Sequence, residues 1–249
     1  MTHPTSEFRF YEELNDFLPV ESRRRTITVE LDRGRSVKDA IESAGVPHPE
    51  VDLILVDGES VGFDHVLRGG ERVAVYPVFE RLDIGPLVHL RPAPLRDPRF
   101  VLDSHLGKLA RHLRLAGFDA LWDKDYADEE IVRISLAEKR IILTRDIGLL
   151  KRGAVERGYF VRSTDAEIQL GEVVGSLQLE RLLRPFSRCR ECNVELSEAS
   201  KAAVLDRIPE QVREHYERFK RCSACGRVYW EGTHYERLKQ MLARVVLSP

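Results

Sequence analysis

The sequence contains no long apolar run. No window approaches the roughly 18–20 uninterrupted apolar residues that a membrane-spanning helix needs. Residues 1–18 have no apolar segment behind a basic start, so they do not resemble a signal peptide. We therefore expect a cytoplasmic protein with no membrane partner.

Internal repeats and low-complexity segments are also absent from the 249 residues. The hydrophobic fraction of 43% and the charged fraction of 32% are typical of a globular protein and argue against disorder. This length suits one large domain or two ordinary ones.

Cysteine is scarce, and its four residues form two CxxC pairs, Cys189 with Cys192 and Cys222 with Cys225. Two such pairs are typical of a zinc ribbon or a treble-clef-like site, in which four thiolates hold one ion tetrahedrally. Disulfides are the alternative, but a cytoplasmic setting disfavours them. We expect a structural zinc ion, since four cysteine ligands leave no position for water.

The net charge of −2 conceals an uneven distribution. Residues 1–90 carry a net charge of −7, residues 91–180 are neutral, and residues 181–249 carry +5. An acidic head and a basic tail suggest different partners for the two ends.

A proline-rich stretch separates two parts of the chain. It contains Pro86, Pro92, Pro94 and Pro98, a density that disfavours a helix or a central strand. We place a linker at residues 82–98 and predict a domain at 1–81, a second at 99–185, and a zinc ribbon with a closing helix at 186–249.

The pattern before the linker predicts strands at 8–14, 26–31, 51–56 and 72–78, with a helix over 37–44 capped by Ser36. The order β-β-α-β-β resembles the ubiquitin-like β-grasp fold of small sulfur carriers. Those carriers end in a free Gly-Gly, whereas Gly69-Gly70 lies inside this chain. We expect a binding or scaffolding module, with a possible protein partner, that folds alone and takes no part in catalysis.

After the linker, strands alternate with helices, which predicts an α/β fold with a parallel sheet and helices on both faces. Function in such sheets gathers beyond the carboxyl ends of the strands. Asp103, Asp146 and Asp165 each follow a predicted strand, and Asp128 begins the intervening helix. Carboxylates grouped there suit Mg²⁺ or Mn²⁺. Each of these aspartates could instead be only a helix cap or first-turn acid.

Three segments carry a resemblance to a known family. They are FVLDSHLGKLARHLRLAGFDA, DEEIVRISLAEKRIILTRD and the cysteine-rich tail, within about residues 98–237. Together they resemble the Mut-seven C-terminal RNase family, whose fold is PIN-like and whose members often carry an N-terminal ubiquitin-like domain. The resemblance implies a nuclease that binds Mg²⁺ or Mn²⁺ through Asp103, Asp128 and Asp146, with Asp165 at the position where PIN-like folds vary.

Cations and aromatic residues near these motifs predict contacts with RNA, where phosphates meet arginines and bases stack on rings. The alternatives are a solvated helix face for the cations and packing under the ribbon for the aromatic residues. The candidates are Lys108, Arg111, Arg114, Arg145, Arg188, Arg190, Arg221, Arg227, Tyr229, Trp230 and His234.

The leading hypothesis is therefore a metal-dependent ribonuclease acting on structured RNA, with transfer RNA or ribosomal RNA as substrate. The alternatives are a non-catalytic RNA- or ribosome-binding factor and an adaptor that acts through the β-grasp head. Endonuclease, 3′-exonuclease and nucleotidyl transfer share the same metal geometry and stay open.

Overall fold

The computed structural model describes residues 4–31, 34–77, 90 and 97–247. The chain divides into two compact units, one of residues 1–95 with 146–160 and the other of 96–145 with 161–249. The predicted linker at 82–98 lies almost entirely outside the described residues. No helix in the described part has the length and apolar character needed to cross a bilayer.

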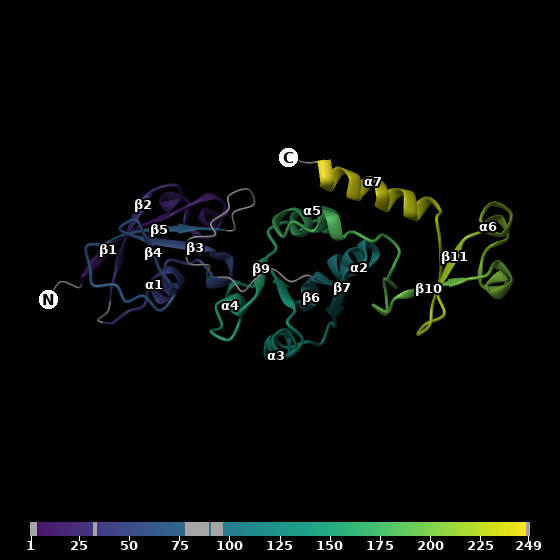
Figure 1. Cartoon of the computed structure of the whole chain (residues 1–249), viewed down its shortest axis with the longest axis horizontal. Helices are drawn as coiled ribbons and strands as arrows, with labels where there is room; N and C mark the ends of the chain where they lie inside the picture. The colour runs from purple at the N-terminus through teal and green to yellow at the C-terminus, as the bar shows by residue number, and fades with distance from the viewer. Residues whose placement is uncertain (1–3, 32–33, 78–89, 91–96, 248–249) are drawn as a thin grey trace. The chain divides into compact units, whose positions relative to one another are not determined.

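The first unit contains a β-grasp fold, as the sequence predicts (Figure 1). Strand β1 lies between β2 and β5, antiparallel to β2 and parallel to β5. The strands are β1 (Thr5–Phe10), β2 (Thr26–Glu30), β3 (Leu53–Val56), β4 (Glu59–Ser60) and β5 (Arg72–Tyr76), in the order β2-β1-β5-β3-β4. Strand β1 ends at Phe10 and not at residue 14 as predicted, because Glu12–Phe17 forms a 3-10 helix.

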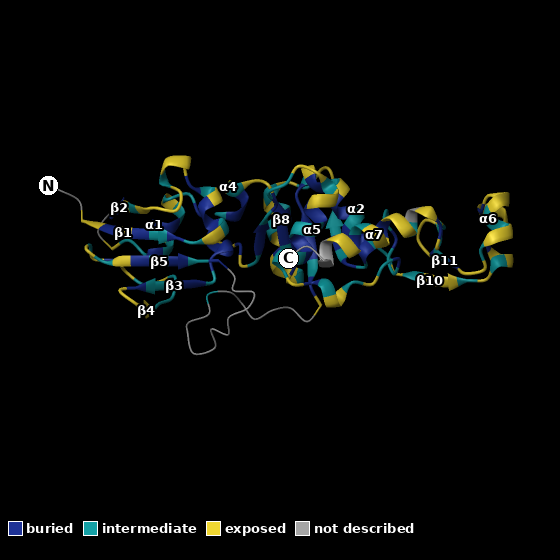
Figure 2. Ribbon diagram, turned by 90° about the horizontal axis from the view of Figure 1, so that it is seen from above, coloured by how far each residue is buried: buried dark blue, intermediate teal, exposed yellow. Residues whose placement is uncertain are grey.

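Helix α1 (Val37–Ser43) covers one face of this sheet and closes its core. It begins where the sequence predicts, since the Ser36 side chain accepts a hydrogen bond from the Asp39 amide at 3.1 Å. Alternating inward residues such as Phe8 and Phe10 of β1 are fully buried against it. In Figure 2 much of the ribbon of β1, β3 and β5 has the colour of buried residues.

Residues 146–160 pack on the β-grasp fold, which the sequence did not indicate. They contain α4 (Ile147–Leu150) and β9 (Gly158–Phe160). The buried Glu50 carboxylate, in a 3-10 turn at His48–Glu50, accepts a hydrogen bond from the Phe160 amide at 2.6 Å. His48 Nε2 lies 2.8 Å from the Val155 carbonyl oxygen, and Lys151 Nζ donates to the Glu42 carbonyl at 2.7 Å.

The second unit contains a parallel sheet in which β6 (Arg99–Leu102) lies between β7 (Asp119–Trp122) and β8 (Ile141–Thr144). Figure 1 shows α3 on one side of these strands and α5 on the other. The helices are α2 (Gly107–Ala116), preceded by a 3-10 turn at Ser104–Leu106, then α3 (Asp128–Glu138) and α5 (Ala166–Ser176). The alternation of strand and helix thus gives the predicted α/β architecture.

The C-terminal part of this unit is a three-stranded antiparallel sheet followed by a long helix. Its strands are β10 (Leu196–Ala199), β11 (Phe219–Cys222) and β12 (Val228–Trp230), and its helices are α6 (Glu210–His215) and α7 (Thr233–Leu247). Residues Val204, Ile208 and Phe219 form a separate small core. The segment between the two CxxC pairs contains β10, two 3-10 turns, the short helix α6 and most of β11.

Candidate functional site

Asp103 lies at the carboxyl end of the central parallel strand. Leu102 pairs with Trp122 on one side and with Leu143 on the other, so Asp103 is next to the ends of β7 and β8. The residue is 8% exposed. Oδ2 accepts a hydrogen bond from Thr144 Oγ1 at 2.7 Å, and Oδ1 accepts one from Ser104 Oγ at 3.1 Å. Two hydroxyl groups therefore orient a nearly buried carboxylate at the carboxyl ends of the parallel strands, where the sequence predicts it.

The other predicted acids occupy the starts of helices. Asp146 caps α4 through the Gly148 amide at 2.7 Å, and Asp165 caps α5 through the Glu167 and Ile168 amides at 2.9 and 3.1 Å. Asp128 is the first residue of α3 rather than its cap. Caps of this kind stabilise helix starts whatever else the carboxylates do.

Asp146 belongs to the first unit and the other three acids to the second. In the described part of the chain, the four cysteines are placed to share a metal ion. Bringing carboxylates together without a cation is unfavourable, because like charges repel.

Asp123 is a further acid at this edge that the sequence analysis missed. It directly follows β7, is exposed, and accepts a hydrogen bond from the Asp125 amide at 3.0 Å. Leu102 pairs with Trp122, so Asp103 and Asp123 each directly follow one member of the last pair of this register. The available signal was its place immediately after a predicted strand, the same criterion that selected Asp103.

Arg145 is exposed, but its guanidinium also has a structural role. One of its terminal nitrogens donates hydrogen bonds to the carbonyl oxygens of Val161, Arg162 and Ser163. Arg145 therefore holds the segment before α5, and a phosphate group would compete with these carbonyls for it.

The row of cations on α2 divides into exposed and buried members. Lys108 is exposed and Arg111 is partly exposed, as a phosphate-binding role requires. Arg114 is buried, which contradicts its assignment to an RNA-binding surface. Its guanidinium donates to the carbonyls of Ala120 at 2.8 Å, Arg190 at 3.1 Å and Glu191 at 2.8 Å, and burial lowers its pKa. Arg114 instead joins α2 to the first CxxC turn.

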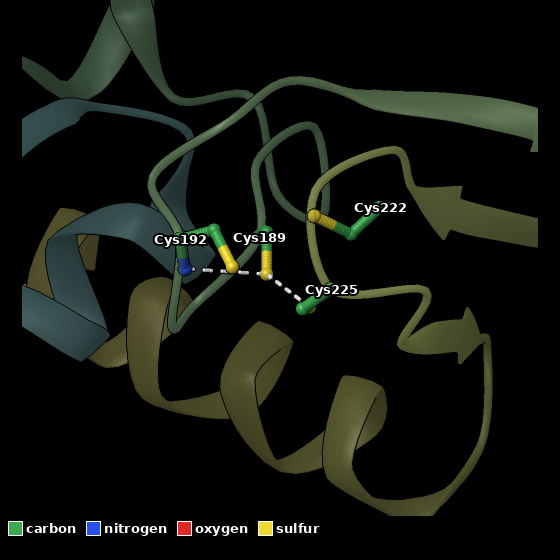
Figure 3. A group of neighbouring side chains, drawn as sticks. All are labelled: Cys189, Cys192, Cys222 and Cys225. Carbon is green, nitrogen blue, oxygen red and sulfur yellow. Dashed lines mark hydrogen bonds between the residues drawn. The ribbon is translucent and has the colours of Figure 1, made fainter.

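The four cysteine sulfurs come together, with all ligand atoms within 4.8 Å of one another (Figure 3). Each CxxC pair forms a tight turn, closed by the Asn193 amide on the Cys189 carbonyl and by the Gly226 amide on the Cys222 carbonyl, both at 2.9 Å. Gly226 has φ of +70°, which favours glycine at that position. The arrangement is close enough to bind a zinc ion.

The thiols differ in their readiness to ionise. Burial opposes ionisation of Cys189, but hydrogen bonds from the Tyr229 hydroxyl and from backbone amides outweigh it and lower its pKa to about 7. The hydrogen bond with Cys225, together with burial and the nearby Cys189 charge, raises the pKa of Cys192 to about 12. Burial raises the pKa of Cys222. A divalent cation would favour the thiolate form of all of them.

Two of the aromatic residues proposed to bind RNA, Tyr229 and Trp230, are covered by contacts within the C-terminal part of the chain. Tyr229 is buried, its hydroxyl donates to Cys189 Sγ at 3.1 Å and accepts from the Arg190 amide at 3.0 Å, and burial raises its pKa. Its assignment as a base-stacking residue is therefore wrong. Trp230 is partly buried against the small core around Phe219. The side chain of His234 lies outside the described part of the chain.

The remaining candidate arginines surround the cysteine site. Glu191 lies between three of them, with Nε of Arg190 at 3.0 Å, Nε of Arg111 at 3.5 Å and a terminal nitrogen of Arg227 at 3.7 Å from its carboxylate oxygens. Three guanidinium groups around one carboxylate leave an excess of positive charge. Arg221 is partly exposed on β11, and Arg188 pairs with Glu195 at 3.4 Å.

Comparison with known proteins assigns most of the chain. Residues 3–83 match the family model described as Mut7-C ubiquitin, and no curated protein matches the chain. Two crystal structures of small archaeal modifier protein 1 from Haloferax volcanii are 19% identical to it. They cover 30% of this chain and 97% of their own, with TM-scores of 0.24 and 0.25. Residues 98–242, more than half of the chain, match the Mut7-C RNAse domain, so the chain belongs to the Mut7-C RNAse family.

Proposed function

We propose that the chain is a metal-dependent ribonuclease that cleaves structured RNA, with transfer RNA or ribosomal RNA as the substrate class. The observation that carries this proposal is the oriented carboxylate of Asp103 at the carboxyl end of the central strand, inside the part that matches the RNAse family. A nearly buried acid held by two hydroxyls is prepared to bind a cation rather than to interact with solvent.

The ligands of a catalytic Mg²⁺ or Mn²⁺ in this proposal are Asp103, Asp128, Asp146 and Asp165. A divalent cation supplies a water of lowered pKa and stabilises the charge on the phosphoryl oxygens. The role of this chain is to orient the acids. The hydroxyls of Ser104 and Thr144 fix Asp103, while the starts of α4 and α5 fix Asp146 and Asp165.

The proposal also includes a structural zinc ion, held by the four cysteines. Cys189 and Cys222 are buried and Cys192 is partly buried, so the ion would be shielded from solvent on most sides. Zinc prefers thiolate ligands in tetrahedral geometry, and a Cys₄ set favours stability over catalysis.

RNA would bind along the exposed and partly exposed cations near the cysteine site. Arg114 and Tyr229 are buried and are left out of this surface. The proposed RNA-binding surface comprises Lys108, Arg111, Arg188, Arg190, Arg221 and Arg227. The net charge of +5 in residues 181–249 agrees with an anionic partner. Trp230 and Arg145 contribute to this surface only if RNA displaces their present contacts.

One observation favours a second candidate, a non-catalytic RNA- or ribosome-binding factor that retains the nuclease fold. The acids Asp146 and Asp165 act as helix caps, a role that requires no metal ion. A binding factor would keep the cationic surface and lose the catalytic cation.

The test is to incubate the purified protein with total cellular RNA and Mn²⁺ or Mg²⁺ and to sequence the RNA ends. New ends that depend on the metal and disappear in the Asp103→Asn variant would support the ribonuclease. RNA that is retained by the protein but never cut, under either metal, would favour the binding factor.

A further inference from the structure

Trp122 is held in a fixed orientation beside Asp103. It is the last residue of β7 and pairs with Leu102, the residue before Asp103. Its indole Nε1 donates a hydrogen bond to the Ser104 carbonyl oxygen at 3.0 Å. The same Ser104 places its hydroxyl on the Asp103 carboxylate. The indole and the carboxylate are therefore attached to one short turn.

The other constraint on the ring comes from Gly107, at the start of α2. A Cβ atom added there would lie 2.5 Å from Cζ2 and 2.8 Å from Cε2 of Trp122, closer than real side chains approach. The indole thus lies directly on the backbone of the helix, in a space that only glycine leaves open. Strand pairing, a hydrogen bond and close packing together leave the ring little freedom.

Trp122 is nevertheless only partly buried, and the next residue, Asp123, is exposed. A core tryptophan would be buried, whereas part of the surface of Trp122 stays exposed at the end of β7. A rigid and partly exposed aromatic ring loses little entropy when a second ring stacks on it. Nucleobases stack on such rings whatever their identity, because every base has a π-face.

We propose that Trp122 forms a nucleobase-binding subsite beside the Asp103 edge, which stacks an unpaired base next to the phosphate to be cleaved. This inference rests on the proposed ribonuclease function and specifies its substrate, which must present an unpaired nucleotide such as a loop or a single-stranded end. A fully paired duplex keeps its bases stacked internally and cannot use the subsite.

The chain offers a direct test, because Trp122 and Trp230 are its two tryptophans. In the full-length Trp230→Phe variant, all tryptophan fluorescence comes from Trp122. The same protein would also carry the Asp103→Asn substitution, which prevents cleavage. It would be titrated, with Mn²⁺ present, into an adenine-rich single-stranded RNA that carries a terminal fluorescein. Fluorescein anisotropy reports binding, and tryptophan emission reports stacking on Trp122.

We expect the emission of Trp122 to be quenched along the same binding curve as the anisotropy, and a paired RNA of the same length to cause no such quenching. Trp122→Ala should weaken binding of the single strand by about 5- to 150-fold and leave duplex binding unchanged, while Trp122→Phe should retain most of the affinity. If Trp122→Ala fails to fold by circular dichroism, the quenching experiment decides, since it leaves Trp122 in place.

Two results would overturn the subsite in distinguishable ways. Anisotropy that reports binding without quenching would reject the subsite and leave the proposed ribonuclease intact. No binding of either RNA would remove the RNA-directed function and the subsite with it.

Discussion

Asp103 is the residue on which the enzymatic proposal depends most directly. It combines burial with two hydroxyl donors, Thr144 and Ser104, which is unusual for a carboxylate that has only a structural task. The exposed Asp123 follows β7, the strand that pairs with β6. Carboxylates that follow neighbouring parallel strands suit a divalent cation.

We expect the Asp103→Asn variant to keep its fold and lose its activity. An amide retains the shape and can still exchange hydrogen bonds with both hydroxyls, so the free energy of unfolding should change by less than about 1 kcal/mol. Loss of a charged metal ligand should lower the cleavage rate by at least about a hundredfold. The measurements are cleavage kinetics and the melting temperature with and without Mn²⁺.

The control for this substitution is Asp206→Asn, which changes an exposed acid far along the chain. It should leave cleavage and the stabilisation by Mn²⁺ unchanged. An Asp103→Asn protein that cuts RNA at the wild-type rate would rule out the metal site as proposed.

The cysteines lead to a prediction about pH. In the metal-free protein near pH 7, Cys189 is about half ionised, whereas Cys192 and Cys222 hold their protons because their pKa values are raised. Zinc binds thiolates and must displace these protons, so its affinity should increase as pH increases.

Zinc must displace at least the protons of Cys192 and Cys222, so the dissociation constant for zinc should fall at least about a hundredfold for each pH unit. Calorimetry in buffers of different ionisation enthalpy measures the protons released. Cys222→Ser should bind no zinc tightly and should expose residues 219–230 to proteolysis. Protein purified without chelator that contains no zinc, or an affinity independent of pH, would contradict this assignment.

At the level of elements, a buried polar network joins the first CxxC turn to the edge of the parallel sheet. Asp119 of β7 accepts hydrogen bonds from Arg140 at 2.7 Å and from Asn193 Nδ2 at 2.6 Å. Asn193 Oδ1 accepts from the Ala120 amide at 3.1 Å. Burial opposes ionisation of Asp119, but these donors outweigh it and lower its pKa. The cysteine-rich part is thereby fixed to the strand that ends at Trp122.

Asp119→Ala should therefore be strongly destabilising. It leaves the Arg140 guanidinium, whose side chain is 5% exposed, without its main counter-ion, and should cost about 3 kcal/mol in the free energy of unfolding near pH 7. A group with a lowered pKa stabilises the fold above its unfolded pKa and ceases to do so as pH falls through the folded value. The difference between the variant and the wild type should thus shrink below about pH 4.

Urea unfolding at several pH values measures this difference. The matched control is Glu130→Ala, which removes an exposed ion pair with Arg133 on α3 and should have no measurable effect. Equal stability of Asp119→Ala and wild type at pH 7 would show that the network contributes little.

At the level of the whole molecule, the β-grasp fold is joined to residues 146–160. Glu50 and His48 of the head contact Phe160 and Val155, and Lys151 contacts Glu42 of the head. The segment that makes these contacts begins at the proposed metal ligand Asp146. That the head folds alone and takes no part in catalysis stays a prediction, with the addition that residues 146–160 pack on it. The head holds a segment from the RNAse part of the sequence.

Glu50→Ala should loosen this segment, since it leaves the Phe160 amide without its carboxylate partner. Hydrogen exchange of residues 146–160 should speed up, and the unfolding free energy should fall by about 1–3 kcal/mol. Glu50→Gln keeps an acceptor and should behave more like the wild type. Exchange in 146–160 that is unchanged in Glu50→Ala, and also unchanged after removal of residues 1–95, would show that the segment does not depend on the head.

The sequence by itself determined the α/β class, the β-grasp head and the two CxxC turns. These depend on local signals: residue periodicity, caps such as Ser36, and the spacing of Cys189 and Cys192 within a turn. It also placed Asp103 at the edge of the sheet, because the end of a strand can be recognised from the chain alone.

Only the tertiary structure decided which polar and aromatic residues are covered. Arg114 lies in a cationic row, yet its guanidinium is buried against the carbonyls of a turn that is 76 residues away in sequence. Tyr229 donates to Cys189 instead of facing RNA, and Trp122 lies on Gly107. Periodicity shows which residues share a face, but what covers that face depends on contacts between distant segments. Long-range packing therefore assigns these residues their roles.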